Sequence, residues 1–303
     1  MIILVAGASG LAGSAIYREL KKYGEEVVGI SSKEVNLLDR KATFEYLRKL
    51  KPKVVIDAAA KVGGISANDS FPVEFLSENI QIQTNLMDAS HMADVEKFVF
   101  LASSCVYPRI CPQPIKEEYV LSGPLEPTNS AYALAKLSGI ELIKSYRRQF
   151  GHKWISVMPT NLYGPNDNFD LESSHVFPAL IRKLIESKHS GAKSVTLWGS
   201  GKPRREFLHV DDLAKAVVVC LEKYDSNQQI NIGTGLDLTI EELSKKIAKS
   251  VEFGGEVNWD TTKMDGTPRK VLDIARISNL GWKPSISLDE GISLTVEWYL
   301  KNK

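Results

Sequence analysis

Two residues four positions apart, Tyr132 and Lys136, could together donate and accept a proton. They stand in the stretch YALAK, within a segment whose pattern predicts a helix. Residues at this spacing lie on one helix face, so the ammonium could sit near the phenol and lower its pKa by favouring the ionised form. The same spacing also arises by chance on surface helices, so the pair alone does not establish a site.

A serine and a cysteine follow an apolar run earlier in the chain. The stretch LASSCVYP places Ser103 at the end of a predicted strand and Cys105 two residues later. Ligands bind at the carboxyl ends of strands in open α/β sheets, so the Ser103 hydroxyl could hold a substrate carbonyl beside Tyr132. If the chain stays extended there, Cys105 shares the side of Ser103. From spacing alone, a cysteine in that position is more often a small buried apolar residue.

A glycine-rich turn near the start of the chain predicts a dinucleotide site. In GASGLAG, three glycines follow the apolar run IILVA and open a predicted helix. Glycines let a pyrophosphate approach the backbone, and the helix N-terminus stabilises its charge. The spacing G-x-x-G-x-x-G resembles the short-chain dehydrogenase/reductase superfamily. The predicted contacts are Gly7, Ala8, Ser9, Gly10, Leu11, Ala12 and Gly13.

The end of the second predicted strand bears on which dinucleotide binds. An NAD enzyme usually places a carboxylate there, on the adenosine ribose. This chain has Ser31, Ser32 and Lys33, whose hydroxyls and ammonium suit a 2′-phosphate, so the sequence favours NADP(H). Glu34 follows directly and leaves NAD(H) open.

The elements that must position these residues form an α/β pattern. Five apolar runs, IILVA, EVVGI, KVVIDA, KFVFLA and WISVM, alternate with helix-period segments, which predicts a doubly wound parallel sheet. After about residue 159 the pattern loosens into short strands such as SVTLW and helices such as LTIEELSKKIAKSV. We expect a cofactor-binding Rossmann domain over 1–160, with returning segments from about 205–235, and a smaller α/β substrate-binding lobe mainly over 161–303.

Composition narrows the class of protein. The chain has 303 residues, is 43% hydrophobic and carries a formal net charge of +1, which favours neither nucleic acid nor a membrane as partner. Its three cysteines, Cys105, Cys111 and Cys220, lack metal-ligand spacing and are odd in number. We therefore expect no metal site, no disulfide framework and a cytoplasmic protein.

Eight stretches in chain order closely resemble the GDP-L-fucose synthase family, within the extended short-chain dehydrogenases/reductases. They are AAAKVGGI, SSCVYP, LEPTNSAYALAK, MPTNLYGPNDNF, SHVFPAL, WGSGKPRREFLHVDD, NIGTG and DGTPRK. Several are shared by all extended members, but SSC followed by SHVFPAL is not. Sugar-nucleotide dehydratases carry an Asp-Glu pair after the fourth strand, and UDP-galactose-type epimerases carry a small residue at the cysteine position.

The resemblance implies two reactions at one site. GDP-4-keto-6-deoxy-D-mannose would be epimerised on both sides of its ketone, and NADPH would then reduce the ketone. Cys105 looks like the base and His175 like the opposing acid, although a single histidine is more often a loop or core residue. Tyr132 would protonate the alkoxide, Lys136 would tune the phenol, and Ser103 would polarise the ketone.

The same resemblance implies further contacts and a homodimer joined through helices of the first domain. The remaining cofactor contacts are Ser32, Lys33, Asp39, Leu101, Ala102, Ser103, Ser104, Lys136, Pro159, Thr160, Asn161, Leu162 and His175. The implied substrate contacts are Lys183, Trp198, Arg205, Asp265 and Lys270. Many family members have arginine in place of Ser9 and Ser32, and some have it in place of Lys183. We expect the serines to weaken the preference for NADP and Lys183 to alter the affinity for substrate.

Two alternatives remain open from the sequence. A related epimerase/reductase of another GDP-deoxysugar, such as the colitose precursor, would use the same catalytic residues. A dinucleotide-sensing protein without catalysis predicts loss of the tyrosine or lysine, yet Ser103, Tyr132 and Lys136 are all present.

Overall fold

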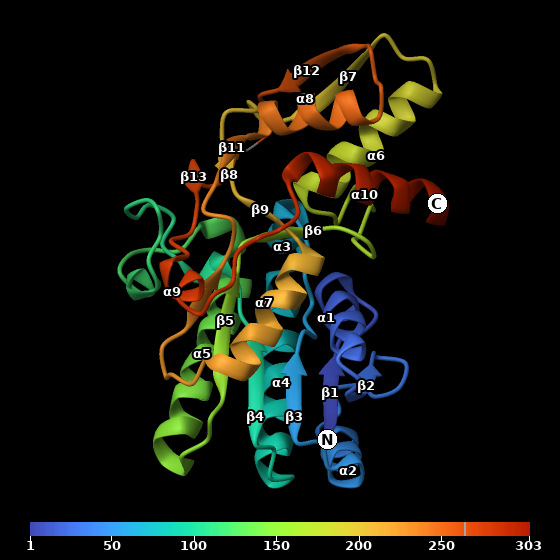
Figure 1. Cartoon of the computed structure of the whole chain (residues 1–303). Helices are drawn as coiled ribbons and strands as arrows, with labels where there is room; N and C mark the ends of the chain where they lie inside the picture. Colours follow the sequence, from blue (N-terminus) through green and yellow to red (C-terminus); the bar gives the residue numbers. More distant parts are fainter. Residues whose placement is uncertain (264) are drawn as a thin grey trace.

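A parallel sheet of six strands forms the centre of the protein in a computed structural model that describes residues 1–263 and 265–303 (Figure 1). The strand order is β10-β5-β4-β3-β1-β2. The strands are β1 (Ile2–Ala6), β2 (Glu26–Ile30), β3 (Val54–Asp57), β4 (Lys97–Leu101), β5 (Ile155–Pro159) and β10 (Ile230–Ile232). The inner strands are apolar and buried because helices cover both faces.

The helices divide between the two faces of the sheet. One apolar core joins the sheet to α1 (Leu11–Lys22) and α7 (Val210–Lys223), and a second joins it to α2 (Arg40–Leu50), α4 (Pro72–Met92) and α5 (Ser130–Phe150). Figure 1 shows α1 and α7 on one side, with α4 and α5 behind the strands. The predicted doubly wound parallel sheet is confirmed.

A smaller lobe lies beyond the carboxyl ends of the central strands (Figure 1). It contains α6 (Val176–His189), α8 (Ile240–Ser250), α10 (Leu288–Asn302) and the parallel pair β7 (Ser194–Trp198) and β12 (Glu256–Asp260). Val195 and Leu197 alternate with exposed residues along β7 and pack into a third apolar core with α6, α8 and α10. A capping box of Thr239 and Glu242 fixes the start of α8.

Short elements join the lobe to the sheet. β11 (Leu238–Thr239), β8 (Arg204–Arg205) and β13 (Arg269–Lys270) form a small sheet, and β6 (Asn161–Tyr163) pairs with β9 (Phe207–His209). The remaining short helices are α3 (Ile65–Ser70), α9 (Ala275–Ser278), η1 (Ser104–Val106), η2 (Glu117–Tyr119) and η3 (Pro127–Asn129). In the described part of the chain, no helix is both long and apolar enough to span a bilayer.

Candidate active site

The glycine-rich turn forms a cradle at the start of α1. Gly7 has a φ of +78°, and the N–H groups of Gly7 and Ala8 both donate to the Ile30 carbonyl at 2.9 Å. Gly10 is the N-cap of α1 and has no side chain to occupy the helix start. A β-carbon at Gly13 would collide with the carbonyl oxygen of Gly7. The free N–H groups and close backbone approach therefore fit a dinucleotide pyrophosphate.

Replacement Gly13→Ala tests this cradle. Because the added methyl must displace the backbone of Gly7, we expect NADPH binding to weaken about ten-fold or more. Fluorescence titration with NADPH measures the change. Gly254→Ala is the matched control, since a β-carbon there meets nothing within 4 Å. Equal affinities for the two variants would contradict the assignment.

Acidic side chains near the end of β2 are held by local contacts. The Glu34 carboxylate accepts from the Ser31 N–H at 2.7 Å and hydroxyl at 2.6 Å, which lowers the Glu34 pKa. Asp39 caps α2 by accepting from the Ala42 N–H at 3.0 Å. The structure thus gives Asp39 a structural role, while its predicted cofactor contact and those of Ser32 and Lys33 stay predictions.

The chain does not stay extended after β4, so one geometric expectation is wrong. Ser103 is extended, but η1 begins at Ser104 and turns the chain. The turn closes because the Ser103 hydroxyl accepts a hydrogen bond from the Cys105 N–H at 3.2 Å. Cys105 therefore reaches the site from a turn. Its sulfur still lies near Tyr132, since its negative charge would raise the pKa of that phenol.

The expected lowering of the Tyr132 pKa by Lys136 is also wrong in this structure. Burial raises the pKa of Tyr132 above its usual value, and the nearby Ser103 side chain only partly offsets this. The Lys136 Nζ lies 5.9 Å from the centre of the tyrosine ring and donates to the Leu101 carbonyl at 2.8 Å. The phenol consequently stays protonated near neutral pH, which suits a proton donor.

A buried carboxylate that the sequence interpretation gave no role lies beside this lysine. Asp57 is the last residue of β3 and is fully buried. Among the described residues, its carboxylate accepts one hydrogen bond, from the Ala59 N–H to Oδ1 at 3.1 Å. Burial raises the pKa of Asp57 to about 6, and Lys136 opposes this rise. Burial lowers the pKa of Lys136 to about 8, and Asp57 opposes that fall.

Asp57→Asn should therefore change the alkaline limb of the pH profile. Removing the carboxylate removes a charge that holds the Lys136 pKa up, so that pKa falls below about 8 and the ammonium loses its proton at lower pH. We expect the alkaline limb of NADPH-dependent reduction to move down by about one pH unit. Asp289→Asn, at the exposed start of α10, is the control. An unmoved limb in Asp57→Asn would contradict this prediction.

His175 lies at the N-cap of α6, in the smaller lobe. His175 is exposed to solvent, so its imidazole can exchange protons with water. The preceding loop packs on the AAAKVGGI stretch, where the Gly64 N–H donates to the Ser173 carbonyl at 2.9 Å. A β-carbon at Gly64 would collide with the Ser174 carbonyl, so glycine permits this close packing.

The PTNL stretch turns from β5 into β6. Thr160 and Asn161 both donate from their side chains to the Glu206 carbonyl, at 3.3 and 2.8 Å. These bonds give their polar groups a structural role next to the carboxyl end of β5. The predicted cofactor contacts of Pro159, Thr160, Asn161 and Leu162 stay predictions, as do those of Leu101, Ala102 and Ser104 at the end of β4.

The predicted substrate residues fall into two neighbouring groups. Arg205 and Lys270 are register partners on β8 and β13. Arg205 is half-buried, and this burial lowers the pKa of its guanidinium, while the nearby Cys105 sulfur opposes that fall. In the second group, the Lys183 Nζ lies 4.6 Å from the ring centre of Trp198, which is half exposed.

Asp265 connects these groups. Its carboxylate accepts from the Ser200 N–H at 2.7 Å and the Ser200 hydroxyl at 2.6 Å, in the turn after Trp198. A β-carbon at the next residue, Gly266, would lie 3.6 Å from an Arg205 nitrogen. The DGTPRK loop therefore lies between the turn after Trp198 and the guanidinium of Arg205.

Comparison with known proteins identifies the family. A family model described as the NAD-dependent epimerase/dehydratase family matches residues 3–233. The chain belongs to this family. GDP-L-fucose synthase 1 of Arabidopsis thaliana is 50% identical over 301 residues, covering 99% of this chain and 93% of its own. GDP-L-fucose synthase of Escherichia coli (strain K12) is 47% identical over 311 residues, covering 99% and 97%.

A solved member of the epimerase/dehydratase family has the same architecture. The GDP-L-fucose synthetase from Naegleria fowleri bound to NADP aligns with a TM-score of 0.91 at 31% identity, covering 99% of this chain and 94% of its own. The resemblance that the eight motifs carry is thus confirmed over the full chain.

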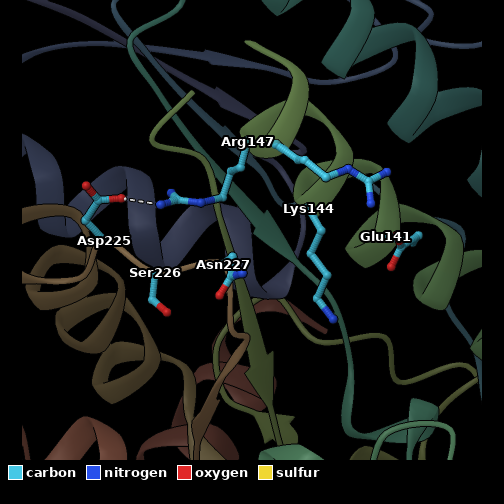
Figure 2. Close-up of a pocket in the computed structure, with 7 residues that line it drawn as sticks. Glu141, Lys144, Arg147, Asp225, Ser226 and Asn227 are labelled. Atoms are coloured by element: carbon cyan, nitrogen blue, oxygen red, sulfur yellow. Dashed lines mark ion pairs between the residues drawn. The ribbon is translucent and has the colours of Figure 1, made fainter. Parts of the chain in front are cut away.

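A surface hollow elsewhere contains none of the predicted site residues. It lies between α5 and the loop after α7 and is lined by Glu141, Lys144, Arg147, Arg148, Asp225, Ser226 and Asn227. Figure 2 shows the Arg147 side chain directed at Asp225, with an ion pair of 2.8 Å. This pair ties α5 to the loop, whereas Ser103 follows β4 at the opposite, carboxyl edge of the sheet.

Proposed function

We propose that the chain is a GDP-L-fucose synthase, which converts GDP-4-keto-6-deoxy-D-mannose to GDP-L-fucose by 3,5-epimerisation followed by reduction of the 4-ketone with NADPH. The observation that carries the proposal is the grouping of Ser103, Cys105, Tyr132 and Lys136 at the carboxyl edge of the sheet, beside the glycine cradle. Full-length identity of 46–50% to curated GDP-L-fucose synthases supports it.

Epimerisation requires a base and an acid on opposite faces of the sugar ring. The Cys105 thiolate removes the proton from a carbon next to the ketone, and the electron pair moves onto the ketone oxygen as an enolate. The Ser103 hydroxyl donates to that oxygen and stabilises its charge. His175 then returns a proton from the opposite face, which inverts the carbon. Cys105 then releases its proton to water and His175 takes one up from water, so the cycle can operate once at C3 and once at C5.

Reduction uses the same polarised ketone. NADPH supplies the hydride when it is bound. The Tyr132 hydroxyl gives its proton to the alkoxide oxygen as the C–O double bond is lost, and the Lys136 ammonium stabilises the phenolate that remains. Because Ser103 stabilises negative oxygen in both reactions, one pocket serves both.

The predicted substrate residues suit a nucleoside diphosphate sugar. Arg205, Lys270 and Lys183 supply cations for the diphosphate, and Trp198 offers an indole face for the base or sugar. Lys183 binds as a point charge without the planar fork of an arginine, so we expect it to orient the diphosphate less strictly.

NADP is the proposed cofactor, with Ser32 and Lys33 beside its 2′-phosphate. The hydroxyls of Ser31 and Ser32 and the ammonium of Lys33 support this, because these groups suit a 2′-phosphate. An NADP-bound structural neighbour supports it independently.

The proposed organisation has a cofactor-binding domain over 1–160 with returning segments from about 205–235, and a mainly substrate-binding domain over 161–303. In support, β10 lies in the central sheet and α7 packs with α1. We propose a homodimer joined through α4 and α5, near whose N-terminal ends Phe71, Val73 and Leu134 are exposed. A cytoplasmic location suits the free thiols of the three cysteines.

The deciding experiment incubates the purified protein with GDP-4-keto-6-deoxy-D-mannose and either NADPH or NADH. The expected result is cofactor oxidation, faster with NADPH, and formation of GDP-L-fucose. An untouched ketone in protein that still binds NADPH would overturn the substrate assignment, and turnover of another GDP-deoxysugar, such as the colitose precursor, would replace it.

A further inference from the structure

Asn129 is the N-cap residue of α5, but its side chain does not cap the helix. It is the last residue of η3 and the N-cap of α5. Asparagine is among the preferred N-cap residues because its oxygen accepts from a backbone N–H of the first turn. The Asn129 side chain makes no such bond. Another contact therefore determines its orientation.

That contact is with the sulfur of Cys105. The Asn129 Nδ2 donates to the Cys105 Sγ at 3.5 Å, which joins the turn before α5 to the turn after β4. The Asn129 Oδ1 is buried and has no partner among the described residues. Buried polar atoms are nearly always satisfied, so an orphaned oxygen at a site requires an explanation. The amide thus presents its nitrogen to the sulfur, and its oxygen makes no capping bond to the start of α5.

The turn that carries Asn129 is fixed by its neighbours. The buried Glu126 carboxylate accepts from the Thr267 hydroxyl at 3.2 Å and from the Thr128 hydroxyl at 3.4 Å, and it pairs with Arg109 at 3.3 Å. These bonds connect η3 to the DGTPRK loop. The amide is thereby held in place before any substrate arrives.

We propose that Asn129 is a positioning residue for Cys105, whose amide N–H stabilises the thiolate and fixes the direction in which the sulfur removes a proton. The role of this contact in catalysis rests on the proposed function, whereas the contact between Asn129 and Cys105 is independent of it. An N–H donor favours a charged sulfur over a neutral thiol because a hydrogen bond to an ion is stronger. The other groups that face the sulfur are the Arg205 guanidinium from β8 and the Tyr132 phenol from α5. Glu126 and Asp265 in turn lie near Arg205.

Two variants separate this role from a structural one. Asn129→Ser and Asn129→Asp both keep a strong N-cap residue, so α5 should form as before. Serine is too short to retain the amide donor, and aspartate replaces that donor with a negative charge. Circular dichroism and thermal melts verify the fold, and the serine variant carries the test if the aspartate variant does not fold.

The measurement is the pH dependence of Cys105 alkylation by iodoacetamide, followed by mass spectrometry, with Cys111 as the internal reference. We expect the midpoint to rise by about one pH unit in Asn129→Ser, and further in Asn129→Asp, with an unchanged profile for Cys111. Exchange of deuterium from D2O into the GDP-ketosugar should slow about ten-fold at neutral pH, while NADPH oxidation by the ketone slows less.

An alkylation profile of Cys105 that matches wild type in both variants would overturn the proposal. A second outcome is that the alkylation profile shifts in the variants while wild type exchanges no deuterium into GDP-4-keto-6-deoxy-D-mannose. This outcome upholds the contact between Asn129 and Cys105. It counts against the proposed substrate, so failure of the Asn129 proposal can be distinguished from failure of the proposed function.

Discussion

Tyr132→Phe should lower the rate of ketone reduction by about 10²–10⁴-fold while leaving NADPH binding intact. Burial keeps the phenol protonated near neutral pH, so its hydroxyl is the proton source for the alkoxide. Phenylalanine retains the aromatic ring, whose centre lies 6.4 Å from that of Phe75 in an edge-on arrangement. It has no hydroxyl proton to donate. The loss therefore falls on the chemical step and not on the fold.

Single-turnover oxidation of NADPH in the presence of the GDP-ketosugar measures this effect. Deuterium exchange into the ketosugar should continue in Tyr132→Phe, because Cys105 and His175 remain. Tyr23→Phe is the control, since Tyr23 is 58% exposed at the end of α1 and should oxidise NADPH as wild type does. Tyr132→Phe reducing the ketone at a rate within about ten-fold of wild type would show that another group supplies the proton.

The central fold was predictable from sequence because its signals are local. The five apolar runs became β1 to β5, since a short run of successive apolar residues is typical of a strand in a parallel sheet covered on both faces. The two-residue strands β8, β11 and β13 were not predictable. They exist because Arg205 pairs with Lys270 and with Leu238, residues distant in the sequence, and local propensity carries no information on such pairing.

Topology also predicted where the catalytic side chains gather, but not their electrostatics. Ser103 follows β4, so the parallel sheet directs it to the carboxyl edge whatever the details of the loop. The turn at Cys105 depends on one side-chain bond to the backbone, which spacing cannot show. The raised pKa of Tyr132 reflects burial by segments from the whole chain.

Some residues near the site carried weaker signals in the sequence. Asp57 is an acid at the end of an otherwise apolar strand, and a charged residue within such a run often has a specific role. Asn129 lies inside the LEPTNSAYALAK stretch and precedes a helix, where it reads simply as a cap. Only its contact with the Cys105 sulfur distinguishes it.

Cys105→Ser should reduce epimerisation by about 10²–10⁴-fold and leave reduction largely intact. A thiol is a much stronger acid than an alcohol, so replacing it by a hydroxyl removes the group that can act as a base near neutral pH. Serine has nearly the same size, and the backbone N–H at this position can still donate to the Ser103 hydroxyl. Tyr132 and Lys136 are unchanged, so the ketone can still be reduced.

Deuterium exchange at C3 and C5, followed by NMR in D2O without NADPH, reports the proton removal directly. With NADPH added, Cys105→Ser should yield a reduced GDP-6-deoxyhexose whose C3 and C5 are not inverted. Cys111→Ser is the matched control, because that thiol lies six residues away, is half-buried and has a pKa raised by its burial. It should exchange both positions as wild type does.

Exchange at the wild-type rate in Cys105→Ser would remove the cysteine from the mechanism. His175 would then have to take the proton from one face and return it to the same face, which exchanges hydrogen without inverting carbon. The product configuration distinguishes these cases, since inversion needs two groups on opposite sides of the ring. Loss of both exchange and inversion in Cys105→Ser, with reduction retained, is the combination that only a cysteine base on one face explains.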